Sequence, residues 1–219
     1  MGELYDVVCA LLRDVCRFAE YGSHLRLRGY QAQVASAIVD SVIGRKGLSF
    51  VVIFPRQSGK NELQAQIETY LLTALSHFDA EIVKVSPTYK PQTLNAMRRL
   101  ERTLKRNICT HALGWRKESG FIYRVGKARA IFLSGSQTAN VVGATASELL
   151  ECDEAQDVLI AKWDKDFAPM AASTNATRVF WGTAWTSNTL LSRELRLAQA
   201  AEKADGIPRI FRIDAAEVA

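Results

Sequence analysis

The sequence has few of the residues that build disulfide-linked or metal-centred folds. It contains four cysteines and three histidines among 219 residues. No two cysteines form a C-x-x-C pair and their spacing does not repeat, which argues against a disulfide framework or a zinc ribbon. Cys109 and His111 lie close together, but two possible ligands do not make a metal site. This cysteine usage favours a reducing, intracellular compartment.

Long hydrophobic runs and targeting signals are also absent. The longest apolar run, residues 48–54, is interrupted by Ser49 and is far too short to span a bilayer. The first residues are acidic before they are basic, unlike a secretory signal, and Asp6 stands where a myristoylation signal has Ser or Thr. No internal repeat, low-complexity tract or linker is found. We therefore expect a protein without a membrane partner.

What the sequence does have is the composition of a globular protein. Hydrophobic residues make up 48% and charged residues 23% of a chain long enough to bury a sizeable core, which argues against disorder. The formal net charge of +5 permits a polyanionic partner but does not demonstrate one.

Short apolar runs alternate with stretches of helical periodicity. Strands are predicted at residues 49–54, 81–86, 121–125, 128–134, 147–153, 176–185 and 209–214. Helices are predicted at residues 3–20, after Gly29 and Tyr30, from the loop after the first strand to near His77, and at 91–107 and 189–204. Strands 121–125 and 128–134 are expected to pair through a turn at Gly126 and Lys127. This alternation predicts an α/β fold with a mainly parallel sheet flanked by helices.

The first motif is the loop PRQSGK, residues 55–60, between an apolar strand and a helix. A phosphate-binding loop needs backbone N–H groups and a helix N-terminus around the phosphates, and a lysine that reaches them. Gly59 and Lys60 match the end of G-x-x-x-x-G-K-[ST], whereas Phe54 replaces the first glycine and Asn61 the final Ser or Thr. The strand and helix supply the required context. The alternative is an ordinary strand–turn–helix with an exposed lysine.

The second motif is an acidic pair, Asp153 and Glu154, at the end of the strand predicted at 147–153. An ATPase needs one acidic group for the hydration shell of Mg²⁺ and a second that activates water. Glu151 lies within the same strand and would need a cationic partner or an exposed face. Seen singly, such a pair could be a solvated turn. The order and context of the two motifs together favour an ATPase.

These residues resemble the ATPase domain of tailed-phage large terminase subunits, the motors that package DNA into capsids. In that family the phosphate loop often lacks the first glycine, and one branch reads Arg-Gln-x-Gly-Lys-Asn. Arg56, Gln57, Gly59, Lys60 and Asn61 match that branch, and ECDEAQ follows downstream. The resemblance extends to LRGYQ at 27–31 and to Gly-Thr-Ala at 182–184. It implies a P-loop NTPase fold of the ASCE type.

The resemblance also implies a role for each matching residue. Gln31 would recognise the adenine edge, and Arg56, Gln57, Ser58, Gly59, Lys60 and Asn61 would surround the triphosphate, with Asn61 near Mg²⁺. Asp153 would bind Mg²⁺ through water. Glu154 would activate the hydrolytic water, and Lys60 and Arg56 would be the other catalytic residues. Gly182 and Thr183 would couple hydrolysis to movement.

This sequence lacks one feature that is common in the family. Many members carry an arginine before a glycine in the segment preceding the acidic strand, where it acts on a neighbouring subunit's nucleotide. In this sequence Val142 stands before Gly143. Either the trans-acting arginine comes from elsewhere, or Arg56 supplies the charge in cis.

The function implied is Mg²⁺-dependent ATP hydrolysis that powers packaging of double-stranded DNA. The implied partners are DNA, further copies in a homo-oligomeric ring, the portal and the small terminase subunit, in the host cytoplasm at the capsid portal. We expect one ATPase domain over 1–219: N-terminal helices at 1–46, the P-loop core at 47–186, and a last helix and strand at 187–219. No nuclease domain or DNA cleavage is expected, because Glu194 and Glu202 in the tail lie two helical turns apart, too far to share metal ions.

Two other functions compete with this interpretation. A superfamily 2 helicase has similar motifs, but it needs a second RecA-like domain, which 219 residues are not expected to hold. The GKN sequence of the loop also differs from the GK[ST] of helicases. A nucleotide-binding assembly subunit that does not hydrolyse ATP is the other alternative. Lys60, Asp153 and Glu154 are all present, which argues against it.

Overall fold

The computed structural model describes residues 9–136, 143–183 and 186–214. The strands are β1 (Ser49–Ile53), β2 (Glu81–Ser86), β3 (Trp115–Glu118), β4 (Ile122–Val125), β5 (Ala128–Ser134), β6 (Leu149–Cys152), β7 (Thr177–Gly182) and β8 (Ile210–Arg212). The α-helices are α2 (Val15–Arg17), α3 (Gly29–Ile43), α4 (Lys60–Ala74), α5 (Leu94–Arg106), α6 (Ile108–Leu113), α7 (Ile160–Lys162) and α8 (Leu190–Asp205).

The eight strands of the described residues form one sheet, in the order β3-β4-β5-β2-β6-β7-β1-β8. Neighbouring strands pair in parallel along the part β5-β2-β6-β7-β1-β8. At the other edge, β4 pairs antiparallel with both β3 and β5. The β4–β5 hairpin turns at Gly126 and Lys127, where Gly126 has a φ of +57° that favours glycine. The predicted α/β class, the mainly parallel sheet and the hairpin are therefore confirmed.

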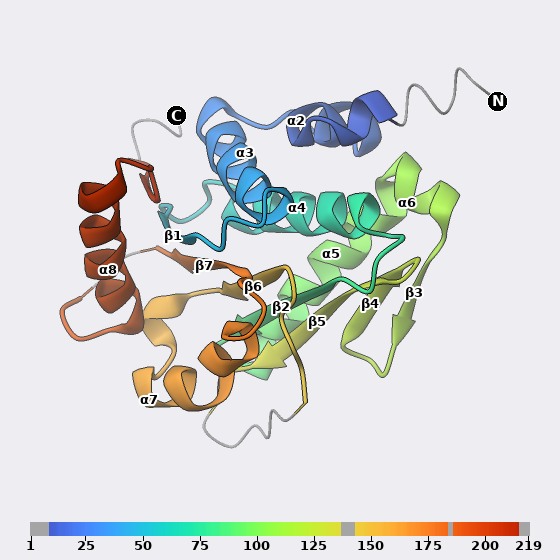
Figure 1. Cartoon of the computed structure of the whole chain (residues 1–219). Coiled ribbons are helices and arrows are strands. Elements are labelled where there is room, and N and C mark those ends of the chain that lie inside the picture. Colours follow the sequence, from blue (N-terminus) through green and yellow to red (C-terminus); the bar gives the residue numbers. More distant parts are fainter. Residues whose placement is uncertain (1–8, 137–142, 184–185, 215–219) are drawn as a thin grey trace.

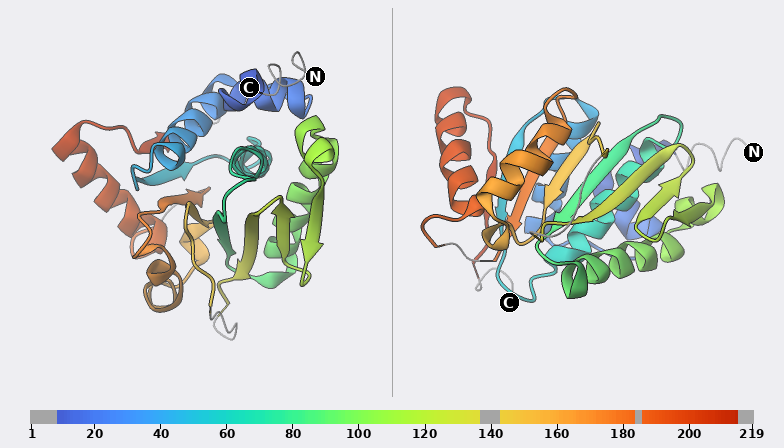
Figure 2. Two further views of the ribbon diagram at one scale, coloured as in Figure 1. Left: turned by 45° about the vertical axis from the view of Figure 1, so that its right-hand side comes forward. Right: turned by 90° about the horizontal axis from the view of Figure 1, so that it is seen from below.

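Helical segments cover both faces of the sheet (Figure 1). In β1, Phe50 and Val52 join the core formed with α3 and α4, whereas Val51 and Ile53 join the core formed with α8 and the segment around α7. This alternation follows from the two-residue period of a strand, with both faces buried. Figure 2 shows α8 beside the β1 end of the sheet and the β3–β4 hairpin at the other end.

Some elements differ from the prediction. The helix predicted at 91–107 begins at Leu94, because residues 89–93 form a π-helical turn. α6, β3 and the short helical turns between Ala155 and Ala171 were not predicted. β3 reads Trp-Arg-Lys-Glu, an edge strand without the apolar signal of a buried one. Residues 1–8 of the first predicted helix and 184–185 of a predicted strand lie outside the described residues.

The charge expected inside a strand, Glu151, is completely buried in β6 and has the cationic partner that the sequence required. Its Oε2 lies 3.9 Å from Nζ of Lys84, directly across on β2, and its Oε1 accepts a hydrogen bond of 3.0 Å from Trp181. Burial raises the pKa of Glu151 well above its ordinary value, although the charge of Lys84 opposes this. None of the helices in the described part of the chain is long and apolar enough to cross a membrane.

Candidate active site

The loop after β1 brings the start of α4 to the carboxyl end of the sheet. Gly59 precedes α4 with a φ of +82°, and no side chain of the described residues caps the first N–H groups of this 15-residue helix. Ser58 Oγ donates to the carbonyl of Pro55 at 2.7 Å, which holds the loop closed on itself. An uncapped helix N-terminus presents N–H groups and partial positive charge, the arrangement that anions bind.

Gln31 connects α3 to this loop. Its Oε1 accepts from the Arg28 N–H at 2.9 Å, and its Nε2 lies 3.4 Å from the carbonyls of Ser58 and Gly59. Only 6% of Gln31 is exposed. Both ends of its amide thus contact the chain itself, and its recognition of adenine remains a prediction.

We expect Gly59→Ala to lower both stability and anion binding. A Cβ at Gly59 would lie 2.6 Å from Gln31 Nε2, in a backbone conformation that L-residues rarely adopt. Strain of this kind costs about 1–3 kcal/mol, which denaturant unfolding would measure. Gly120→Ala is the matched control, because Gly120 has a φ of +77° but open space around it. Equal losses in both variants would contradict a constraint from Gln31.

The predicted acidic pair lies directly opposite the loop. Lys60 Nζ is 3.4 Å from Asp153 Oδ1 and makes a short ion pair with Glu154 Oε1. Glu154 has a φ of +46°, an uncommon value for a residue other than glycine, and such backbone outliers cluster at functional sites. Its other oxygen accepts from Gln156 at 2.6 Å and from Thr183 at 3.4 Å. Three segments distant in sequence therefore meet at Glu154.

The charges around Asp153 keep it ionised although it is buried. Burial by itself would raise its pKa, but Lys60, Lys84 and the hydrogen bond from Gln64 together lower the pKa of Asp153 below its ordinary value. A buried carboxylate in this state is a suitable oxygen donor for Mg²⁺, which proteins commonly hold through one or two carboxylates together with substrate phosphates.

A cavity of about 340 Å³ opens between the loop and the acidic pair. Its walls include Arg56, Lys60, Asn61, Glu154 and Thr183. A neighbouring hollow is lined by Asp153 together with Arg56, Asn61 and Glu154. The structure therefore brings together all the predicted site residues except Gln31 and Gly182, which lie beside these walls: Gln31 contacts the loop carbonyls, and Gly182 precedes Thr183. Ala184 lies outside the described residues.

The wall residues that were not predicted from the sequence include Arg99 and Gln156. Arg99 comes from α5 and pairs with Glu62 at 2.9 Å. No short-range pattern signals this contact, because the two residues belong to different helices. Gln156, which hydrogen-bonds Glu154, belongs to the ECDEAQ motif, and its place beside the acidic pair was the signal that could have identified it.

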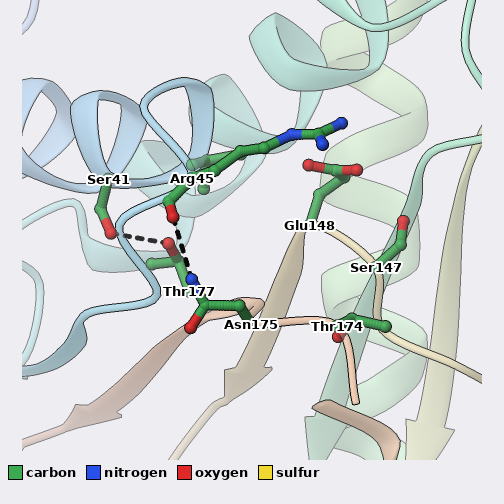
Figure 3. Close-up of a pocket in the computed structure, with 8 residues that line it drawn as sticks. Ser41, Arg45, Ser147, Glu148, Thr174, Asn175 and Thr177 are labelled. Carbon is green, nitrogen blue, oxygen red and sulfur yellow. Dashed lines mark hydrogen bonds between the residues drawn. The ribbon is translucent and has the colours of Figure 1, made fainter. Parts of the chain in front are cut away.

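A second cavity, of about 230 Å³, lies at the opposite, amino end of the parallel strands (Figure 3). Several of its polar groups already bond to one another or to the backbone. Ser41 and Thr177 share a hydrogen bond of 2.7 Å, and Asn175 donates to the carbonyl of Arg45 at 2.9 Å. Ligands of open parallel sheets bind beyond the carboxyl ends of the strands, so the cavity beside Lys60 is the candidate active site.

Solved structures with the same fold are large terminases of bacteriophages. The HK97 large terminase superposes with a TM-score of 0.70 at 17% identity, over 92% of this chain and 43% of its own. The large terminase ATPase domain of Thermus phage P74-26 gives 0.52 at 18% identity, over 64% and 61%. The large terminase of the thermophilic bacteriophage D6E, in complex with ADP, gives 0.53 at 12% identity, over 71% and 39%.

This chain thus spans less than half of the HK97 protein. Neither a protein-family model nor a curated protein matches the sequence. At identities this low, the superpositions establish the fold. This chain therefore has the P-loop ASCE fold of phage large terminase ATPase domains, and its sheet order, its loop before α4 and its acidic pair after β6 belong to that fold.

Proposed function

We propose that this chain hydrolyses ATP with Mg²⁺ as the motor domain of a large terminase and so powers the packaging of double-stranded DNA. The observation that carries the proposal is the meeting of Lys60, Asp153 and Glu154 in front of an uncapped helix N-terminus. Phosphoryl transfer to water requires a cationic group, a carboxylate that binds the metal and a second carboxylate that activates the water.

Each side chain has a separate task in this reaction. The N–H groups at the start of α4 and the ammonium of Lys60 bind the phosphates, and Arg56 on the cavity wall adds a further positive charge. Asp153 and Asn61 would hold Mg²⁺, which neutralises charge on the phosphate oxygens. Glu154 accepts the proton of the attacking water. Thr183, 3.4 Å from Glu154, links this carboxylate to the end of β7 and is proposed, with Gly182, to couple hydrolysis to movement.

The rest of the proposal follows from the resemblance. Residues 1–219 would form a single ATPase domain that acts in a homo-oligomeric ring on DNA, together with the portal and the small terminase subunit, in the host cytoplasm. The solved terminases of similar fold are bacteriophage proteins, and one of them binds ADP, which supports a nucleotide at this site.

The direct test is a steady-state phosphate-release assay with ATP, with and without double-stranded DNA, in Mg²⁺ and in EDTA. We expect turnover in Mg²⁺, none in EDTA, and a higher rate with DNA. A chain that binds ATP but never releases phosphate would instead be a non-hydrolysing assembly subunit. Unwinding of a duplex with a single-stranded tail would favour the helicase alternative.

We also expect the rate to depend on assembly. Val142, outside the described residues, occupies the position of the family's trans-acting arginine. An arginine that reaches the site from another part of a neighbouring chain would leave the charge that stabilises the transition state incomplete in a monomer. An arginine supplied in trans raises phosphoryl-transfer rates by ~10³–10⁵ in related systems. Turnover per chain measured over a dilution series should therefore fall steeply as the chains separate.

Arg56→Ala distinguishes the two sources of this charge, with Arg98→Ala on the exposed face of α5 as the control. Fast turnover that is independent of concentration in the parent chain and is lost in Arg56→Ala would show that Arg56 acts in cis. That result would contradict the expected dependence on assembly.

A further inference from the structure

A second group of charges lies behind the acidic pair, between the sheet and α4. It consists of Glu68 on α4, Lys84 on β2 and Glu151 on β6, which are each at most 3% exposed. Lys84 Nζ lies 2.7 Å from Glu68 Oε1, whereas Glu151 Oε2 is farther away, at 3.9 Å. Glu68 is therefore the main counter-ion of Lys84. Buried charges are costly unless they are paired, so a buried cluster beside an active site calls for a functional explanation.

Gln64 connects this cluster to the active site. It lies one helical turn before Glu68, so both side chains face the same side of α4. Lys84 Nζ donates to Gln64 Oε1 at 3.0 Å, and Gln64 Nε2 donates to Asp153 Oδ1 at 3.1 Å. An unbroken chain of hydrogen bonds thus runs from Glu68 through Lys84 and Gln64 to the carboxylate of Asp153.

The chemistry of the two end groups determines which way the amide of Gln64 points. An ammonium group only donates hydrogen bonds, and an ionised carboxylate only accepts them. The amide oxygen must therefore face Lys84 and the amide nitrogen must face Asp153. A flipped amide would place its oxygen against a carboxylate and its NH₂ against an ammonium, so Lys84 excludes that orientation.

In this arrangement the two carboxylate oxygens of Asp153 differ in their hydrogen bonding. Oδ1 receives the hydrogen bond from Gln64 and lies 3.4 Å from Lys60 Nζ. Among the residues that the structure describes, none makes a hydrogen bond to Oδ2. The carboxylate is thus anchored through one oxygen, and its other oxygen is left for a ligand.

We propose that Lys84 and Gln64 are positioning residues for the divalent cation: Lys84 orients the Gln64 amide, which holds Asp153 with Oδ2 turned to the metal. This inference rests on the proposed function and adds residues from β2 and the middle of α4 to its metal site. Mutation of a residue that hydrogen-bonds a metal ligand, without touching the metal itself, typically changes metal affinity by about 10–100-fold.

The test measures metal affinity rather than turnover. Mn²⁺ is titrated into the full chain with a non-hydrolysable ATP analogue, followed by electron paramagnetic resonance, and binding of the analogue is measured separately in EDTA. Gln64→Leu removes both hydrogen bonds of the amide and keeps its bulk. We expect it to weaken Mn²⁺ binding by about 10–100-fold and to change metal-free binding of the analogue by no more than about twofold.

The double variant Glu68→Gln/Lys84→Met tests the lysine. It removes Lys84 together with Glu68, its main counter-ion at 2.7 Å, which proteins tolerate better than the loss of one partner, and Glu151 loses only its longer contact of 3.9 Å. Gln64 and Asp153 stay in place, but nothing fixes the amide, so Mn²⁺ binding should weaken by about tenfold, the lower end of that range. Glu151→Gln is the matched control: it alters the same cluster without touching Gln64 and should keep the parent's affinity for Mn²⁺.

The outcomes separate this inference from the proposed function. Parent-like Mn²⁺ affinity in Gln64→Leu overturns the positioning role and leaves the proposed ATPase intact. Parent-like affinity in a folded double variant overturns the role of Lys84. A parent chain that binds the analogue equally well with and without Mn²⁺ overturns the Mg²⁺-dependent function and the inference with it. Should the double variant fail to fold, Gln64→Leu still decides whether the Gln64 amide positions Asp153.

Discussion

Glu154→Gln is expected to bind ATP as the parent chain does and to hydrolyse it ~10²–10⁴-fold more slowly, the usual contribution of a general base. Gln keeps the shape of the side chain, its amide oxygen can still accept from Lys60, and its NH₂ can donate to the hydroxyl of Thr183, so the cavity should persist. It cannot accept a proton from water. Because only the transition state uses that proton transfer, kcat should fall while ATP affinity stays the same.

Phosphate release and equilibrium binding of a fluorescent ATP analogue would measure the two quantities separately. Glu148→Gln is the matched control, since Glu148 borders the cavity at the opposite end of the strands and should leave both unchanged. Turnover of Glu154→Gln at the parent rate would remove Glu154 from the reaction and leave Lys60 and Asp153 without a base beside them.

Lys60→Ala should abolish nucleotide binding. Lys60 is 6% exposed, and its ammonium lies between two carboxylates, 3.4 Å from Asp153 and in a short ion pair with Glu154. Its removal takes away the main positive charge that would meet the phosphates. It also leaves two neighbouring carboxylates without the positive charge that lies between them, which repels an anionic ligand further. We expect ATP affinity to fall by at least ~10²-fold, because hydrogen bonds to charged groups contribute about 1.5–3 kcal/mol each and the repulsion adds to their loss.

Loss of a buried charge partner also affects folding. Removing one member of a buried pair costs about 3–5 kcal/mol, although the partial exposure of Glu154 lowers this figure. Urea unfolding of Lys60→Ala beside Lys46→Ala, which alters an exposed lysine near the end of α3, would measure the difference. Nucleotide binding by a folded Lys60→Ala protein at the parent's affinity would contradict the assignment of the loop.

The sequence alone was enough to predict the central strands and the loop between β1 and α4. Phe50, Val51, Val52 and Ile53 are consecutive apolar residues that face opposite sides of a sheet covered on both faces, and such runs are recognisable locally. Gly59 and Lys60, and the pair Asp153 and Glu154, are recognisable for the same reason. Each is a short segment whose proposed function depends on its immediate context of strand and helix.

Only the tertiary structure decided how the site is supported. Gln64, Lys84 and Asp153 are separated by long stretches of chain, and nothing near each of them in sequence indicates that they meet. Their contacts depend on the strand order that sets β2 beside β6 and on the alignment that puts Lys84 across from Glu151. The same holds for Arg99 and Glu62, which meet where α5 packs on α4. Local patterns determine elements and motifs, whereas contacts between distant charges follow from topology and packing, because burial makes a charge dependent on partners that the fold brings to it.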